Sequence, residues 1–284
     1  MKILVIGASG QVGRCLMKRL TAHEVVGTGF AHAQGLMKLD LADADSVGAN
    51  IAEMHPDLIL VPGGITAVDW CESNRAQAER VCVGGSRAVQ SMARKIRAHV
   101  VHFSTDYLFP GGKGPYREDA PIRPLSAYGH VKYAAEQAIR ESGGSFAIVR
   151  TSMVYSHDPG GKNFCQFVRD RLAVAQEVKA FSDQTGSPTF APALARAVIE
   201  IGERRLEGVW NVAGPDVLSR LQFAERVARA FALPTGSLRG VTSAELPLPA
   251  KRPGLHAGLD VSKAQRELRT PLLSVEQACA EMGR

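Results

Sequence analysis

The chain has 284 residues, enough for two domains of ordinary size or one large α/β unit. Hydrophobic residues make up 45% of it and charged residues 22%, which is typical of globular proteins and excludes a disordered chain or a coiled coil. The formal net charge of +6 is spread thinly and no apolar stretch approaches the ~18 residues of a membrane helix, so we expect neither nucleic acid nor a membrane as partner.

The cysteines and histidines show no pattern of a metal site. The five cysteines are scattered without a C-x-x-C pair, and the eight histidines lack the spacing of metal ligands. The amino-terminal residues run directly into glycines and contain no cleavable small-residue site. We therefore predict a cytoplasmic protein with reduced thiols and no bound metal.

The first 150 residues alternate short apolar runs with longer amphipathic stretches. Runs that are β-branched and apolar on both faces favour buried parallel strands, and their alternation with helices predicts a Rossmann-type doubly wound sheet. We expect strands at residues 3–6, 25–29, 58–61, 100–103 and 146–149, and helices at 11–20, 45–54, 77–97 and 127–141. Residues 1–150 are thus predicted to form a dinucleotide-binding domain.

The pattern loosens after residue 150. A helix is expected at 164–174, a strand at 209–212 and a helix at 221–231, with Gly- and Pro-rich loops between them. We predict a smaller mixed α/β lobe over residues 151–284, whose segments could interleave with the first domain. In such proteins a ligand binds at the carboxyl ends of the strands, where a second lobe can close over it.

A glycine-rich loop follows the first predicted strand. Gly7, Gly10 and Gly13 are spaced so that the chain can turn tightly, approach a pyrophosphate and pack the next helix against the strand. This position makes the loop a strong indication of a dinucleotide, although a glycine turn that binds nothing is the alternative. The cofactor residues predicted here are Gly7, Ser9, Gly10, Gln11 and Val12.

The end of the second strand bears on the choice between NAD and NADP. Gly29 and Phe30 lie there, without the acidic residue that usually binds the ribose 2′-hydroxyl of NAD. This favours NADP, with NADPH preferred over NADH, although the arginine expected for a 2′-phosphate is also missing. Asp40 and Leu41 could contact the adenine end, but Asp40 is equally suited to a turn.

A tyrosine and a lysine stand one helical turn apart at Tyr128 and Lys132, downstream of the hydroxyl residues Ser104 and Thr105 that end the fourth strand. Reduction of a ketone requires a proton for the developing alkoxide, and an adjacent ammonium is expected to lower the pKa of the phenol. Thr105 can hold the carbonyl oxygen near the phenol, and Lys132 can bind the nicotinamide ribose. We predict Thr105, Tyr128 and Lys132 as catalytic residues; a surface helix pair is the alternative for the last two.

These motifs resemble the extended short-chain dehydrogenase/reductases, and within them the dTDP-4-dehydrorhamnose reductase group. The resemblance covers nearly the whole chain and includes residues 7–13, 66–69, 104–107, 114–118, 150–155 and 183–189 in the expected order. It implies NADPH-dependent reduction of the C4 ketone of a nucleotide-linked 4-keto-6-deoxyhexose, with Tyr128 as the proton donor. A homodimer is a possible assembly, which the sequence does not decide.

The same resemblance implies further site residues. It adds Gly63, Gly64 and Ser104 to the cofactor contacts, along with Tyr128 and Lys132. On the substrate side it implies Thr105, Asp106, Tyr107, Met153, Asn163, Gln184 and Arg252.

Several positions depart from relatives. The sugar-nucleotide dehydratases carry an acidic residue where this chain has Tyr107, so dehydration is not expected. Met153 stands where the rhamnose enzyme has a tryptophan, and methionine does not stack as a flat ring, so the sugar or base could differ. Cys82 replaces an asparagine of many relatives, and residues 61–65 lack the usual Asn-Ala-Ala.

A second resemblance, to the regulatory subunit of methionine adenosyltransferase, rests on residues 27–30 and 115–118. That subunit has this fold and binds NADP, and in this interpretation the nucleotide is structural and the surface binds a partner protein. Tyr128→Phe would then change nothing measurable except binding. Another sugar-nucleotide reductase or an epimerase is a further alternative.

Overall fold

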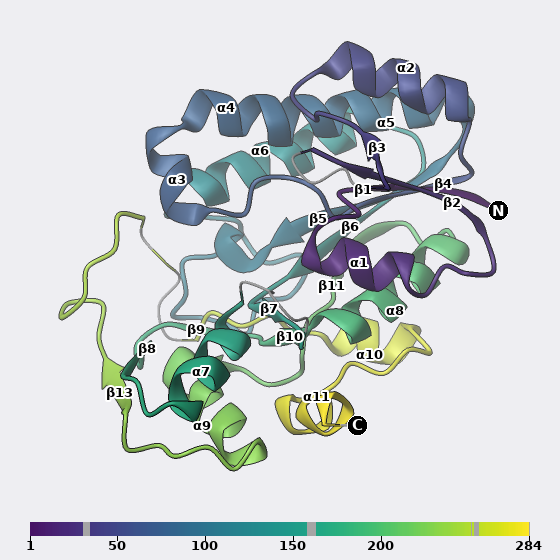
Figure 1. The fold of residues 1–284 in the computed structure, drawn as a ribbon. Helices are drawn as coiled ribbons and strands as arrows, with labels where there is room; N and C mark the ends of the chain where they lie inside the picture. Colours follow the sequence, from purple (N-terminus) through teal and green to yellow (C-terminus); the bar gives the residue numbers. More distant parts are fainter. Residues whose placement is uncertain (31–34, 158–162, 251, 253–255, 284) are drawn as a thin grey trace.

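The computed structural model describes residues 1–30, 35–157, 163–250, 252 and 256–283 (Figure 1). Within them a parallel sheet of seven strands runs in the order β11-β6-β5-β4-β1-β2-β3. The strands are β1 (Lys2–Ile6), β2 (Glu24–Gly29), β3 (Met37–Lys38), β4 (Leu58–Val61), β5 (His99–Thr105), β6 (Phe146–Thr151) and β11 (Gly208–Asn211). The predicted doubly wound parallel sheet is confirmed, and its order reverses between β1 and β4, where such sheets bind their ligands.

Helices cover both faces of this sheet (Figure 1). On one face lie α2 (Ala44–Met54), α5 (Gly85–Ile96) and α6 (Ala127–Ser142), and on the other α1 (Gln11–Met17) and α8 (Ala191–Glu203). Each face has its own apolar core, because residues of the central strands are buried on both sides. This explains why the strands read as continuous apolar runs in the sequence.

The long helix expected over 77–97 is interrupted. It consists of α4 (Arg75–Glu79), a π-helical turn over Arg80–Gly84 and then α5, while α3 (Val68–Ser73) precedes it. The π turn packs against α6, the helix that carries Tyr128. Its Cys82 belongs to the small apolar cluster that also contains Tyr128, so the interruption falls next to a predicted catalytic residue.

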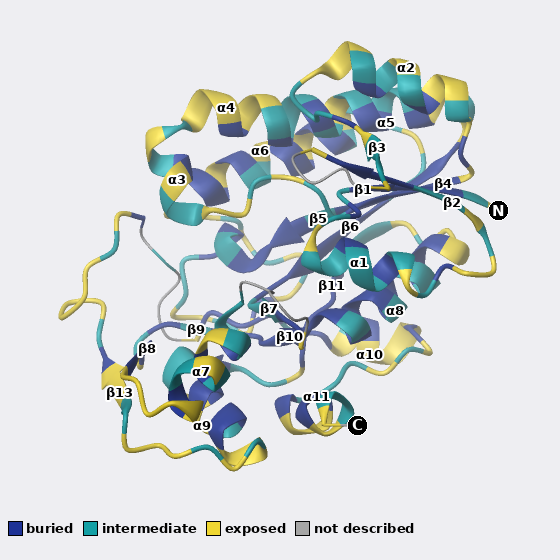
Figure 2. Ribbon diagram, in the orientation of Figure 1, coloured by how far each residue is buried: buried dark blue, intermediate teal, exposed yellow. Residues whose placement is uncertain are grey.

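A second lobe lies below the sheet in Figure 1 and has a separate apolar core. Its helices are α7 (Phe164–Ala173), α9 (Arg220–Ala230) and α11 (Val275–Met282). Three short strand pairs complete it: β7 (Val154–Tyr155) with β10 (Thr189–Phe190), β9 (Thr185–Gly186) with β12 (Leu218–Ser219), and β8 (Val178–Phe181) with β13 (Leu238–Val241). Figure 2 shows these elements burying one side and exposing the other.

The chain passes between the lobes more than once. After the second lobe begins, α8 packs on the first sheet and β11 pairs with β6 at its edge, and α10 (Ser262–Glu267) contacts β11. The division into domains 1–150 and 151–284 stays a proposal. In the described part of the chain, no helix combines the length and the apolar character needed to cross a membrane.

Candidate active site

The loops after β1 and β4 pack against each other at the carboxyl edge of the sheet, and the first of them is also bound to the end of β2. The backbone N–H groups of Gly7 and Ala8 donate to the Thr28 carbonyl at 3.2 and 2.8 Å, and Gly63 N–H donates to the Ile6 carbonyl at 2.8 Å. Gly7 has φ +94°, and a Cβ built there would lie only 2.5 Å from the Gly63 Cα. The glycines are therefore required for these loops to approach each other.

The remaining residues of the glycine loop lead into α1. Gly10 is exposed and caps the helix with its backbone, while Ser9, Gln11 and Val12 are partly buried. The Gln11 amide oxygen can accept hydrogen bonds from the backbone N–H groups of Tyr155 and Ser156, at 3.2 and 3.1 Å. The start of α1 is thus connected to the second lobe.

The predicted adenine-side residues lie at the ends of β2 and β3. Gly29 ends β2 and the Phe30 side chain is 64% exposed; residues 31–34, which follow, lie outside the described residues. The Asp40 carboxylate accepts a hydrogen bond from Ala42 N–H at 2.8 Å, so this side chain has a turn role in the structure. Leu41 packs against the residues of α5.

The three predicted catalytic residues meet where β5 ends. Thr105 is the last residue of β5, and Tyr128 is the second residue of α6, whose start is capped by the Ser126 hydroxyl accepting from Gly129 N–H at 3.2 Å. The side chains of Tyr128 and Thr105 share a hydrogen bond, and both are buried. Lys132 follows on the same face of α6 and donates from Nζ to the Phe103 carbonyl at 2.7 Å.

The pKa of Tyr128 departs from expectation. Burial raises it above the ordinary value for a phenol, whereas the sequence predicted that Lys132 would lower it. The reason is that the Lys132 ammonium is bound to the Phe103 carbonyl and the phenol is surrounded by apolar residues. Tyr128 therefore carries its proton at neutral pH.

Asp106 is a buried carboxylic acid beside this pair. It accepts hydrogen bonds from the hydroxyls of Ser152 at 2.5 Å and Thr105 at 3.3 Å. Burial raises its pKa to about 6 despite these bonds. The next residue, Tyr107, places its ring edge-on to Tyr128 with centroids 5.4 Å apart. The ends of β5 and β6 are thereby joined through polar side chains.

The other predicted substrate residues already have partners in the second lobe. Met153 has φ +44° and its sulfur would contact a Cβ on Gly186. Asn163 caps α7 by accepting from Gln166 N–H at 3.1 Å. The Gln184 amide donates to the Ser243 hydroxyl at 3.0 Å. These three positions are fixed by local structure.

Arg252 reaches back to the first lobe. Its guanidinium donates to both carboxylate oxygens of Asp69, on α3, at 3.1 and 2.7 Å. Asp69 also accepts from Ala250 N–H at 3.0 Å. This bidentate ion pair holds Arg252 and Ala250 against α3, close to the start of α6.

Sequence reasoning missed Arg220, the first residue of α9. Its guanidinium interacts with the Tyr107 side chain and acts electrostatically on Asp106. One signal in the sequence could have indicated it. The charge of an arginine at the first position of a helix interacts unfavourably with the helix dipole, so a role other than stabilising the helix is expected there.

Comparisons with known proteins show the family to which the chain belongs. The family model described as the RmlD substrate binding domain matches residues 1–283. The spore coat polysaccharide biosynthesis protein SpsK of Bacillus subtilis is 34% identical over 89% of this chain and 87% of its own. The dTDP-4-dehydrorhamnose reductase of Salmonella typhimurium is 31% identical over 99% and 98%. The crystal structure of dTDP-4-dehydrorhamnose reductase from Bacillus anthracis in complex with NADP superimposes with a TM-score of 0.91 at 25% identity, covering 99% and 98% of the two chains.

Proposed function

The chain belongs to the family described as the RmlD substrate binding domain, and from this premise we propose that it reduces the C4 ketone of a nucleotide-linked 4-keto-6-deoxyhexose with NADPH. The observation that carries the proposal is the buried Tyr128–Thr105 pair, with Lys132 beside it, at the end of β5. Relatives named dTDP-4-dehydrorhamnose reductase support the substrate class. Two departures, Met153 and Cys82, leave the particular sugar and base to be determined by experiment.

The residues at the sheet edge fit a dinucleotide. The packed loops of Gly7 and Gly63 leave no room for a side chain, and a Cβ on Gly64 would have only the Cys82 sulfur nearby, at 3.9 Å. The backbone of Gly10 is exposed at the start of α1. NADPH, when bound, supplies a hydride to the carbonyl carbon. Gly7, Ser9, Gly10, Gln11 and Val12 would hold its pyrophosphate.

Tyr128 acts as the proton donor. Its raised pKa keeps the phenol protonated, and an alkoxide is a stronger base than a phenolate, so transfer of this proton to the developing alkoxide is favourable. Thr105 shares a hydrogen bond with Tyr128, and its hydroxyl can orient the ketone oxygen toward the phenol. Lys132, held by the Phe103 carbonyl, would bind the nicotinamide ribose.

The test compares wild type with Tyr128→Phe in an assay of NADPH oxidation with nucleotide-linked 4-keto-6-deoxyhexoses. We expect the variant to lose about a hundredfold to ten-thousandfold in turnover because the proton donor is missing. NADPH binding, measured by fluorescence titration, should be unchanged. Tyr133→Phe is the matched control, since Tyr133 lies on the same helix and packs in a different apolar cluster.

Two outcomes would contradict the proposal. One is equal turnover by wild type and Tyr128→Phe. The other is tight NADPH binding without turnover of any such sugar, which would favour a non-catalytic, partner-binding subunit instead.

A further inference from the structure

Arg220 lies where three distant parts of the chain meet. Its guanidinium stands over the Phe164 ring, 5.5 Å from the centroid. It also interacts with the Tyr107 side chain and acts on the Asp106 carboxylate. Tyr107 and Asp106 directly follow β5 in the first lobe, whereas Phe164 and Arg220 begin α7 and α9 in the second. Arg220 therefore faces the first lobe across the site.

The segments around Arg220 are those predicted to contact the substrate. Phe164 follows Asn163, the cap of α7. The backbone N–H of Arg220 donates to the Gln184 carbonyl at 3.2 Å, and the preceding strand β12 pairs antiparallel with β9, in the predicted substrate motif 183–189. Each of these contacts fixes the start of α9 beside the site.

Arg220 and Arg226, both on α9, differ in whether a carboxylate neutralises the charge of the guanidinium. Arg226 is bound to Asp216 at 3.1 Å and to Glu276 at 3.0 Å, so its charge is neutralised within the second lobe. Within the residues that the structure describes, Arg220 has no carboxylate at ion-pair distance. A guanidinium carries five N–H donors in a planar fork, and this arrangement is suited to a phosphate.

We propose that Arg220 binds the diphosphate of the nucleotide-linked substrate, with the Tyr107 hydroxyl next to it. This inference rests on the proposed function. Arg252 also acts electrostatically on Tyr107, so two guanidinium groups contribute to positive potential at this place. The phosphates of the cofactor belong to the loops after β1 and β2, which lie on the other side of β4 from Tyr107. The anion recognised by Arg220 is therefore that of the substrate.

The experiment measures calorimetric binding of dTDP, UDP, GDP and the corresponding nucleosides to wild type, Arg220→Met and Arg220→Lys, all saturated with NADP⁺. We expect Arg220→Met to bind the preferred diphosphate about tenfold to a hundredfold more weakly, because a charge-assisted bidentate contact is lost. Binding of the nucleoside should not change. Arg220→Lys, which keeps the charge but not the fork, should restore part of the affinity.

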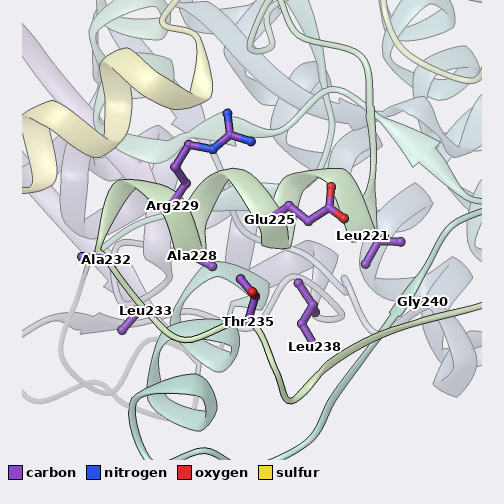
Figure 3. A pocket seen from close by; sticks show the side chains of 9 residues that line it. All are labelled: Leu221, Glu225, Ala228, Arg229, Ala232, Leu233, Thr235, Leu238 and Gly240. Carbon is purple, nitrogen blue, oxygen red and sulfur yellow. The ribbon is translucent and has the colours of Figure 1, made fainter.

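Arg229→Met is the matched control. Arg229 is exposed on the same helix and, with Glu225 and Leu238, lines an open pocket of about 750 Å³ (Figure 3). Its removal should leave diphosphate binding unchanged.

The remaining outcomes separate the inference from the proposed function. Equal diphosphate binding by wild type and Arg220→Met would overturn the role of Arg220 and leave the proposed function intact. Equal weakening for diphosphate and nucleoside would also overturn it, since Arg220 would then only support the fold of the site. Failure of wild type to bind any of the three diphosphates would contradict the proposed function itself.

Discussion

Asp106 is almost free of solvent contact, yet it belongs to a residue type that is normally ionised at neutral pH. Burial raises its pKa from 3.8 to about 6, although the Ser152 and Thr105 hydroxyls both donate to it. Between these two values the folded protein binds a proton that the unfolded chain has released. Stability from this group is therefore full below about pH 4 and is lost as the pH rises through about 6.

Asp106→Asn should expose this effect. The asparagine can still accept from Ser152, but it does not titrate. On going from about pH 7 to about pH 4, the unfolding free energy of the wild type should therefore increase relative to that of the variant. The two-unit change corresponds to at most about 3 kcal/mol. Urea unfolding at both pH values measures it. A difference that is the same at both would show that Asp106 does not titrate with a raised pKa.

At the scale of elements, α6 is held to the sheet by a buried ion pair. Glu136, two turns after Tyr128, accepts from Arg150 of β6 at 2.9 and 2.8 Å, and both side chains are about 1% exposed. Arg150 also donates to the Glu118 carbonyl at 2.9 Å. These bonds fix the position of α6, and with it Tyr128, relative to β5 and β6.

We expect Arg150→Met to destabilise the protein by about 3 kcal/mol, because it removes the bidentate partner of the buried Glu136 carboxylate and leaves the partly exposed Arg140 as its ion-pair partner. Denaturant unfolding tests this. Arg87→Met is the control: Arg87 pairs with Glu141, also on α6, but both are well exposed, and its loss should cost less than about 1 kcal/mol. Equal effects of the two substitutions would contradict the anchoring role.

A third prediction concerns the close contact between Gly7, in the loop after β1, and Gly63, in the loop after β4. Gly7→Ala places a Cβ at 2.5 Å from the Gly63 Cα and a side chain on a residue with φ +94°. We expect a loss of about 1–3 kcal/mol in stability and a weakening of NADPH binding by at least about tenfold, as the two loops are forced apart. Fluorescence titration and unfolding measure the two effects. Gly236→Ala, in open space and without positive φ, should alter neither, and a Gly7→Ala variant with normal NADPH binding would refute the prediction.

Prediction from sequence succeeded where one local signal determines an element. The five predicted strands of the first domain are apolar on both faces, and their positions agree with the structure to within two residues at each end, whereas the two-residue β3 was not predicted. The interruption of 77–97 was missed because a π turn adds one residue to a helical turn but leaves the chain helical on both sides of it. Helix α8 was also missed: it is rich in alanine and buried along most of its length, and its polar face is narrow, consisting of Arg196, Glu200 and Glu203.

Within the site, residue identity could be predicted but environment could not. Thr105, Tyr128 and Lys132 were predicted, and the structure brings them together, although their catalytic roles remain proposals. The pKa of Tyr128 depends on which atoms surround the phenol, and the spacing of Tyr128 and Lys132 does not contain that information. Arg220 lies far along the chain from Tyr107, and only the folded second lobe brings them together.

At the scale of the whole molecule, an ion pair joins the second lobe to the first. Arg252 of the second lobe and Asp69 of α3 form a bidentate pair, in which Arg252 is about 13% exposed and Asp69 about 41%. Hydrogen bonds from Arg252 hold the pKa of Asp69 below its ordinary value even though burial alone would raise it. The Asp69 carboxylate is therefore ionised at neutral pH, and it occupies the N–H donors of Arg252, which we predict to bind the substrate.

Asp69 and a substrate diphosphate should accordingly compete for Arg252. Asp69→Asn keeps an oxygen for Ala250 N–H but removes the opposing charge, so we expect the variant to bind the preferred nucleoside diphosphate a few-fold more tightly. Calorimetric titration measures this, and Asp216→Asn, whose hydrogen bonds to Arg226 and Val275 lie within the second lobe, is the control. Weaker binding by Asp69→Asn would mean that Asp69 orients Arg252 for the substrate, and unchanged binding would mean that Arg252 serves only to join the lobes.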